Sequence, residues 1–280
     1  MARHQQTQAG TAEAPRRRSP LAARTGLWLA PLALGIGLWA LVTVIVRHNT
    51  GAPFPGPMAT GARLWELLTG QQLLGHSIYG HAAASTARWI IGFIAGAAGA
   101  TIIAILVALS PYVERVTMPL VYVLQLIPGL AWIPIAILLF GIGDRATVFM
   151  IVVTALAPVA VNMVAGIKSV SEQHLRVARM AGAGRRDIFL RVLLPSSIPH
   201  LMSGLRTGLG NSWRVVVAAE MIVGKGSGLG YSIIQSRWTL DYPSAFVCIL
   251  FICLVGLVVE YVAFARLERM TVHRWGMVRA

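Results

Sequence analysis

The sequence predicts an all-α, polytopic membrane protein with about six transmembrane helices. Apolar residues make up 56% of the 280-residue chain, and only 12% of the residues are charged. The mean hydropathy is +0.69. A soluble domain carries about a quarter charged residues, so lipid must be the main solvent of this chain. Six spans of roughly 20 residues use less than half of it and leave room for a tail and one or two structured loops.

Long apolar runs locate the spans, at about residues 27–46, 86–109, 116–140, 146–166, 203–223 and 244–264. The second run contains Gly92 and Gly96, a spacing that suits close contact between helices. The third is interrupted at Pro128–Gly129 and again at Pro134. A broken helix at membrane depth is stable only where protein or a cavity covers the freed backbone groups.

Both ends of the chain read as polar tails. Residues 1–26 predict a disordered, basic cytoplasmic tail, and residues 271–280 a C-terminal cytoplasmic tail. The apolar run that follows the first tail has about the length of a span. It exceeds the 7–15 apolar residues of a signal peptide, so we expect an uncleaved first helix. The core transmembrane domain is then expected over residues 86–270.

The segment between the first two spans, within residues 27–85, contains a linker with Pro53, Pro55 and Pro57. An amphipathic stretch near Thr60–Leu74 follows the linker. Such a stretch is typical of a helix that lies at the membrane surface, here the periplasmic one.

The formal net charge of +14 would also suit a nucleic-acid-binding protein. However, the basic residues sort by topology. With the N-terminus inside, most of them fall in the inner segments 1–26, 110–115, 167–202 and 265–280. This bias predicts that both termini lie in the cytoplasm, and it accounts for the charge without a nucleic-acid partner.

The loop from Lys168 to His200 is too long for a hairpin and too polar to enter lipid. It predicts two short cytoplasmic helices, one near residues 175–183 that ends at glycines and one near 186–194. Pro195 and Pro199 are then expected to turn the chain back toward the membrane. Small side chains in the first helix would let it enter a groove of another protein. An ordinary basic cytoplasmic loop is the alternative.

This loop resembles the EAA loop of ABC importer permeases, which reads Glu-Ala-Ala, three residues, Gly, nine residues, Ile, one residue, Leu-Pro. The spacing is kept in full, from Arg176 at the first position through Gly182 at the glycine to Pro195 at the end. The matching positions are Arg176, Val177, Ala178, Gly182, Val192, Leu194 and Pro195. Arg176 replaces the glutamate of the family pattern, so the salt bridge made by that glutamate is not expected here. The docking helix itself is still expected.

The resemblance extends over about residues 60–275 and is closest to the nitrate/sulfonate/taurine branch. It is carried by the strings Gly129–Pro134, Phe140–Gly143, Ala218–Glu220 and Gly228–Tyr231. It implies a type I ABC importer permease fold and alternating access. It also implies a homodimer of permeases, two cytoplasmic ATPase subunits and a periplasmic substrate-binding protein. The implied cargo is a small organic or inorganic anion, similar to taurine, a sulfonate or nitrate.

The family also implies a coupling helix that docks in a groove of each ATPase. Its residues here are Leu175, Arg176, Val177, Ala178, Arg179, Met180, Ala181, Gly182 and Ala183.

The chain shows no sign of being an enzyme. The glycine-rich segment Gly224–Gly228 lacks the order of a P-loop, and we expect it to be a flexible periplasmic loop. Cys248 and Cys253 have no common metal-site spacing and are expected to be reduced, buried thiols. We therefore expect no metal and no cofactor on this chain, with ATP and Mg²⁺ bound by the partner subunit.

Ionisable groups inside spans are costly and usually functional. We expect Arg214, with Asn211, to face the translocation pathway and to offer positive charge to an anion. The alternative is that Arg214 bonds backbone carbonyls at a helix break. Glu220 lies near the outer end of the same span, where it is either a gate or interface contact or a solvated side chain.

Three further pathway candidates are Gln125, Trp132 and Asn162. Apolar packing is the alternative for Trp132, and hydrogen bonds between helices are the alternative for the two amides. For the function of the whole protein, the alternative is a stand-alone secondary transporter or channel. Such a protein has no ATPase subunit, so the loop at 175–195 would have nothing to bind.

Overall fold

The computed structural model describes residues 20–264 and residue 266. Within these residues the chain is helical, with one isolated bridge between Leu73 and His76 and no strand, so the all-α prediction is confirmed. Two compact units make up the chain, Met1–Pro57 and Met58–Ala280. Of the tails predicted at 1–26 and 271–280, residues 1–19 and 271–280 lie outside the described residues.

The first unit is built on α1 (Pro20–Thr50). The helix begins at Pro20, so residues 20–26, expected in the tail, are helical. The proline linker is fastened to the end of α1: Trp39 Nε1 donates to Pro55 O over 3.1 Å, and Arg47 Nε donates to Phe54 O over 3.0 Å. Most apolar side chains between residues 32 and 45 are exposed, as expected of a helix that faces lipid.

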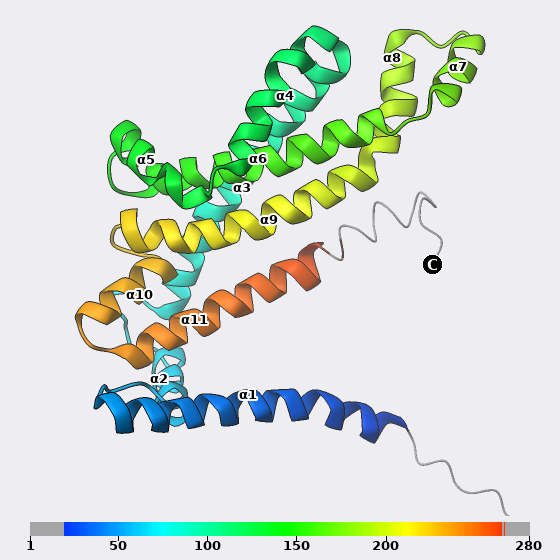
Figure 1. Ribbon diagram of the computed structural model, residues 1–280. Coiled ribbons are helices and arrows are strands. Elements are labelled where there is room, and N and C mark those ends of the chain that lie inside the picture. Colours follow the sequence, from blue (N-terminus) through cyan, green and yellow to red (C-terminus); the bar gives the residue numbers. More distant parts are fainter. Residues whose placement is uncertain (1–19, 265, 267–280) are drawn as a thin grey trace, which may run out of the picture. The chain divides into compact units, whose positions relative to one another are not determined.

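The second unit contains the remaining long helices, α3 (Ile78–Leu109), α6 (Asp144–Lys168), α9 (Leu194–Val223) and α11 (Tyr242–Leu257) (Figure 1). A π-helical segment (Val258–Phe264) continues α11. Over the described residues of both units, five helices are long and apolar enough to cross a membrane, or six if one bent pair is a single span. The expected number of about six spans agrees with this.

The bent pair is α4 (Pro111–Leu126) with the segment Gly129–Phe140, which comprises a 3-10 turn (Gly129–Trp132) and α5 (Ile133–Phe140). The two parts are bent by 104° at the predicted break. A Cβ on Gly129 would lie 2.5 Å from Val215 Cγ2 and 2.8 Å from Thr154 Oγ1. The break is therefore held directly against α6 and α9, which cover its freed backbone groups as lipid requires.

Glycines bring α3, α6 and α9 into close contact. A Cβ on Gly96 in α3 would lie 2.7 Å from Val152 O in α6. A Cβ on Gly204 in α9 would lie 2.8 Å from Asn162 Cβ in α6. Small residues let helices approach in lipid, where packing replaces the hydrophobic effect between them. The contact expected at Gly92 and Gly96 is therefore confirmed.

We predict that Gly96→Ala lowers the stability of the unit, because the added methyl group forces α3 away from α6. Overpacking of this kind costs about 1–3 kcal/mol. Thermal unfolding in detergent measures the loss, with Gly210→Ala as the control, since a Cβ there has no neighbour within 4 Å. Equal melting temperatures for the two variants would show that α3 and α6 are not in such close contact.

The loop that precedes α9 differs in part from the prediction. The first helix, α7 (Glu172–Met180), ends as expected at a glycine, Gly182, with φ of 81°. The second, α8 (Arg185–Ile188), continues through a π turn (Phe189–Leu193) into α9. Pro195 lies in the first turn of α9, directly after the π turn. Both prolines lie inside this helical segment rather than in a loop, and in Figure 1 the chain changes direction between α8 and α9, where the turn was expected.

Three smaller features complete the second unit. The amphipathic stretch forms α2 (Pro57–Leu68), which ends before the predicted Leu74. A helix that the sequence did not indicate, α10 (Leu229–Trp238), lies between α9 and α11. Both cysteines are free; Cys248 is buried as expected, but Cys253 is exposed, so that part of the prediction was wrong.

Candidate functional site

A hollow of ≈ 350 Å³ lies beside the break, between α4, α6 and α9. Among the residues that line it are three of the predicted pathway residues, Gln125, Asn211 and Arg214. The hollow exists because Pro128 ends α4 and Gly129 lets the chain turn against α6. The sequence elements that break the third span therefore also create the space beside Arg214.

A second hollow, of ≈ 780 Å³, lies on the other flank of α9, toward α11. Asn211 and Arg214 line this hollow as well. Arg214 is exposed, and in the described part of the chain its side chain has no hydrogen bond or ion pair. The helix is continuous around it, so the alternative of a bond to backbone carbonyls at a helix break finds no support. The two polar residues thus form a ridge of α9 between two hollows.

Two other candidates do not line these hollows. Asn162 Nδ2 donates to Pro158 O of its own helix over 2.8 Å, which satisfies the amide without a bond between helices. The half-buried Trp132 packs edge-on against Phe149, with the ring centroids 6.3 Å apart. Apolar packing, the alternative considered for Trp132, describes this contact.

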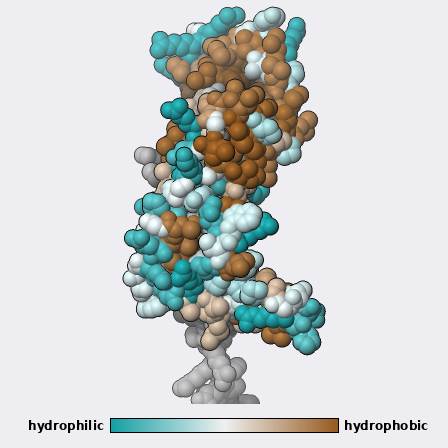
Figure 2. Space-filling view, turned by 90° about the vertical axis from the view of Figure 1, so that its left-hand side faces the viewer, coloured by the Kyte–Doolittle hydropathy of each residue, from teal (hydrophilic) through white to brown (hydrophobic). Residues whose placement is uncertain are grey.

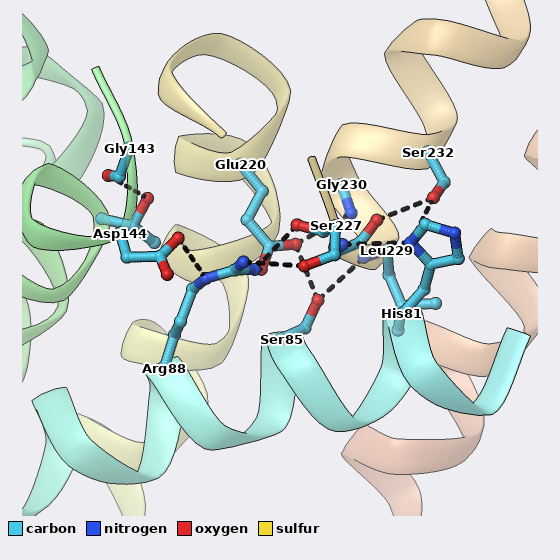
Figure 3. Close-up of polar contacts among 12 residues, drawn as sticks. His81, Ser85, Arg88, Gly143, Asp144, Glu220, Ser227, Leu229, Gly230 and Ser232 are labelled. Carbon is cyan, nitrogen blue, oxygen red and sulfur yellow. Dashed lines mark hydrogen bonds and ion pairs between the residues drawn. The ribbon is translucent and has the colours of Figure 1, made fainter. Parts of the chain in front are cut away.

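Glu220 is neither solvated nor part of either hollow. Its side chain is 0% exposed and accepts an ion-pair hydrogen bond of 2.7 Å from Arg88 Nη1 of α3. Its other carboxylate oxygen accepts from Ser85 Oγ over 2.7 Å and from the Gly230 N–H over 3.0 Å (Figure 3). Of the two alternatives considered for Glu220, solvation is therefore excluded, since its carboxylate is fully buried against α3 and α10.

Arg88 is the centre of this buried network (Figure 3). Its partner Asp144 is the first residue of α6, whereas α7 follows the other end of that helix. Besides Glu220, its guanidinium binds Asp144 Oδ1 at the start of α6 over 2.8 Å. It also donates to Ser227 O over 2.9 Å and to Ser227 Oγ over 3.2 Å. One side chain of α3 thereby fixes the α5–α6 turn and the α9–α10 loop.

His81 adds a second attachment for the α9–α10 loop. Its Nδ1 accepts from the Gly228 N–H over 3.1 Å, and its Nε2 lies 2.9 Å from Leu73 O. Because a backbone N–H can only donate and a carbonyl can only accept, the imidazole is neutral with its proton on Nε2. The loop at 224–228, expected to be flexible, is instead tied to α3 by both Arg88 and His81.

Sequence reasoning missed Arg88, which it counted only among the basic residues outside the inner segments. A signal was present, because His81, Ser85 and Arg88 are spaced four and three residues apart and so share one face of a helix. Three polar side chains on one face at the start of an apolar helix indicate a partner for that face. The partner itself was not visible, since Glu220 lies far away in sequence.

The predicted coupling segment lies at the α7 end (Figure 1). No residue of α7 is buried, and Val177 and Met180 are 60% and 80% exposed. Arg176, which replaces the expected glutamate, pairs with Glu172 one turn earlier over 2.8 Å. At this exposure the pair contributes little to stability. The helix therefore presents apolar side chains with no partner in the described chain.

Comparison with known proteins identifies the family. Residues 96–271 match the model of the binding-protein-dependent transport system inner membrane component. The chain belongs to this family. A probable ABC transporter permease protein of Brucella melitensis is 36% identical over 247 residues, which cover 88% of this chain and 96% of the relative.

Two other relatives of this permease have named cargo. The taurine transport system permease protein TauC of Escherichia coli K12 is 31% identical and covers 77% of this chain and 78% of its own. The nitrate import permease protein NrtB of Leptolyngbya laminosa is 30% identical, over 73% of this chain and 74% of the relative. The chain is therefore an ABC importer permease of the nitrate and taurine type.

Among solved structures, the inward-facing MetNI methionine ABC transporter matches with a TM-score of 0.54 and 18% identity. The match covers 76% of this permease and 97% of that chain. It shows the type I importer fold, as predicted. Permeases of this family are not enzymes themselves and work with an ATPase and a substrate-binding protein, and a stand-alone channel is not favoured.

Proposed function

We propose that this permease conducts a small organic or inorganic anion from periplasm to cytoplasm, past Arg214. The observation that carries the proposal is an arginine without a polar partner in the described chain, on a ridge between two hollows. An unpaired cation at membrane depth is costly unless a ligand or water neutralises it. Relatives named for nitrate and taurine support an anionic cargo such as nitrate or a sulfonate.

The working assembly we propose contains two copies of the permease, two cytoplasmic ATPase subunits and a periplasmic binding protein. Both termini and α7 lie in the cytoplasm, as the distribution of basic residues favours. The Arg88 network then lies at the periplasmic end. ATP and Mg²⁺ bind to the ATPase subunits, and this chain binds no cofactor of its own.

Alternating access follows if the ATPases move α7 and the core transmits the movement. ATP and the loaded binding protein then shift the equilibrium by binding the inward-open and outward-open states with different affinity. A contact suited to this transmission joins Lys168, the last residue of α6, to Glu114 in the first turn of α4. Lys168 shortly precedes α7, and α4 leads to the break beside Arg214.

Replacing Arg214 tests whether this residue contacts an anionic cargo. We predict that Arg214→Gln lowers kcat/KM for anion uptake about 10- to 100-fold, since one charge-assisted contact contributes about 1.5–3 kcal/mol. Arg214→Lys should retain part of the uptake. The measurement is uptake by proteoliposomes that contain the full complex, with the basal ATPase rate as a check on assembly.

The matched control is Arg237→Gln, which removes an exposed cation that stacks on Trp238, 5.6 Å from its ring centroid. It should leave uptake unchanged. If Arg214→Gln transports the anion as well as the parent complex does, Arg214 does not meet the cargo.

A further inference from the structure

Two adjoining hollows lie at the Arg88 end of the second unit, apart from those beside Arg214. The first, which we name the head hollow, measures ≈ 440 Å³. Its lining comprises Phe140, Ile142, Gly143, Asp144, Arg145 and Lys225. The second, the chain groove, measures ≈ 350 Å³. Its lining comprises Phe140, Asp144, Arg145, Val148, Phe149 and Val152.

The head hollow is cationic. Arg145 and Lys225 are both exposed, and over residues 20–264 neither side chain has a hydrogen bond or an ion pair. The only carboxylate of the lining, Asp144, is already bound by Arg88. Two cations therefore remain available for an anionic group that enters the hollow.

The backbone next to the two cations is tied to the buried network. Arg88 binds Asp144, the residue before Arg145, and also binds Ser227, two residues after Lys225. The two loops that carry the cations are thus held to the same side chain of α3 (Figure 3). Because the backbone is held in place, ligand binding has to order only the two side chains, which favours affinity.

The chain groove is apolar and continues from the head hollow, with which it shares Phe140, Asp144 and Arg145. It follows α6 from Asp144 to Val152, about 12 Å at helical rise. Because α6 is a candidate span that begins at Asp144, the cations lie at the membrane surface and the groove lies at hydrocarbon depth. In Figure 2, which faces this end, hydrophobic side chains gather at the height of α4 and α5 and adjoin hydrophilic ones.

We propose that the two hollows form one binding site for an anionic membrane phospholipid. The lipid phosphate lies between Arg145 and Lys225, and one acyl chain lies along Val148, Phe149 and Val152. Basic pockets at the ends of membrane helices bind anionic headgroups in this way. A small soluble anion would use the cations but leave the apolar groove empty, so a lipid accounts for both hollows.

The test is photo-crosslinking in the full, purified complex with phosphatidylglycerol that carries a diazirine on one acyl chain. We expect crosslinks to map to residues 140–152. The Arg145→Gln/Lys225→Gln double variant should reduce them on the order of 30-fold, since each cation near a membrane surface contributes about a factor of five. The Arg237→Gln variant, which removes an exposed cation elsewhere, should crosslink like the parent.

Three outcomes would overturn the proposal. Equal crosslinking by phosphatidylcholine with the same chains would show that the cations do not select the headgroup. Unchanged crosslinking in the double variant would place the lipid elsewhere. Full competition by soluble glycerol phosphate at the concentration of the lipid would show that the site takes a free anion and that the groove contributes nothing.

Discussion

Replacing Val177 and Met180 by aspartate is expected to uncouple the permease from its ATPase. These apolar side chains are 60% and 80% exposed on α7. Burying them against a partner protein would be favourable. Burial of an apolar side chain of this size stabilises a contact by about 1.5–3 kcal/mol. The double variant loses both apolar contacts and places two carboxylates in the interface. ATPase binding should therefore weaken at least about 100-fold.

Co-purification and ATPase activity measure this effect. The double variant should reach the membrane in normal amount, since α7 is exposed and its replacement leaves the packed helices intact. It should retain little ATPase and show no stimulation by the loaded binding protein. Met58→Asp is the control, because Met58 is 89% exposed on α2, in a segment with no expected ATPase contact. Normal ATPase retention by the double variant would contradict the assignment of α7 as the coupling helix.

The sequence predicted the transmembrane helices and the first helix of the loop before α9 because local rules decide both. Lipid requires long apolar runs, and a glycine with positive φ, such as Gly182, ends a helix. The break in the third span followed from Pro128 and Gly129 in the same way. Local rules could not show that Pro195 and Pro199 lie inside a helix, since a proline can either break a helix or occupy its first turn, and only the tertiary structure decides between these.

The buried network could not be predicted, because its members come from distant parts of the chain. Arg88 and Glu220 are separated by 132 residues, and no spacing rule joins them. The helical face of His81, Ser85 and Arg88 was visible, whereas its partners on α6, α9 and the α9–α10 loop were not. Of the pathway candidates, three line the same hollow, namely Gln125, Asn211 and Arg214. Glu220 instead belongs to the buried network.

Breaking the Arg88–Glu220 pair is expected to lower the stability of the protein strongly. The carboxylate of Glu220 is 0% exposed, so Glu220→Ala leaves the guanidinium of Arg88 without its buried partner. Removing one member of a buried ion pair costs about 3–5 kcal/mol. The variant also loses the acceptor for Ser85 Oγ and for the Gly230 N–H, which further weakens the contact of α10 with α9.

The free energy of unfolding in mixed micelles measures this loss. The control is Glu66→Ala, because Glu66 pairs with Arg63 over the similar distance of 2.8 Å but is 52% exposed. An exposed pair contributes about 0–1 kcal/mol, so the control should unfold almost like the parent. The Arg88→Met/Glu220→Met double variant should lose less than the sum of the two single changes, since it leaves neither of the two charges buried without its counterpart. Equal losses for Glu220→Ala and Glu66→Ala would show that water reaches the network, and the fixed loops beside Arg145 and Lys225 would then need another explanation.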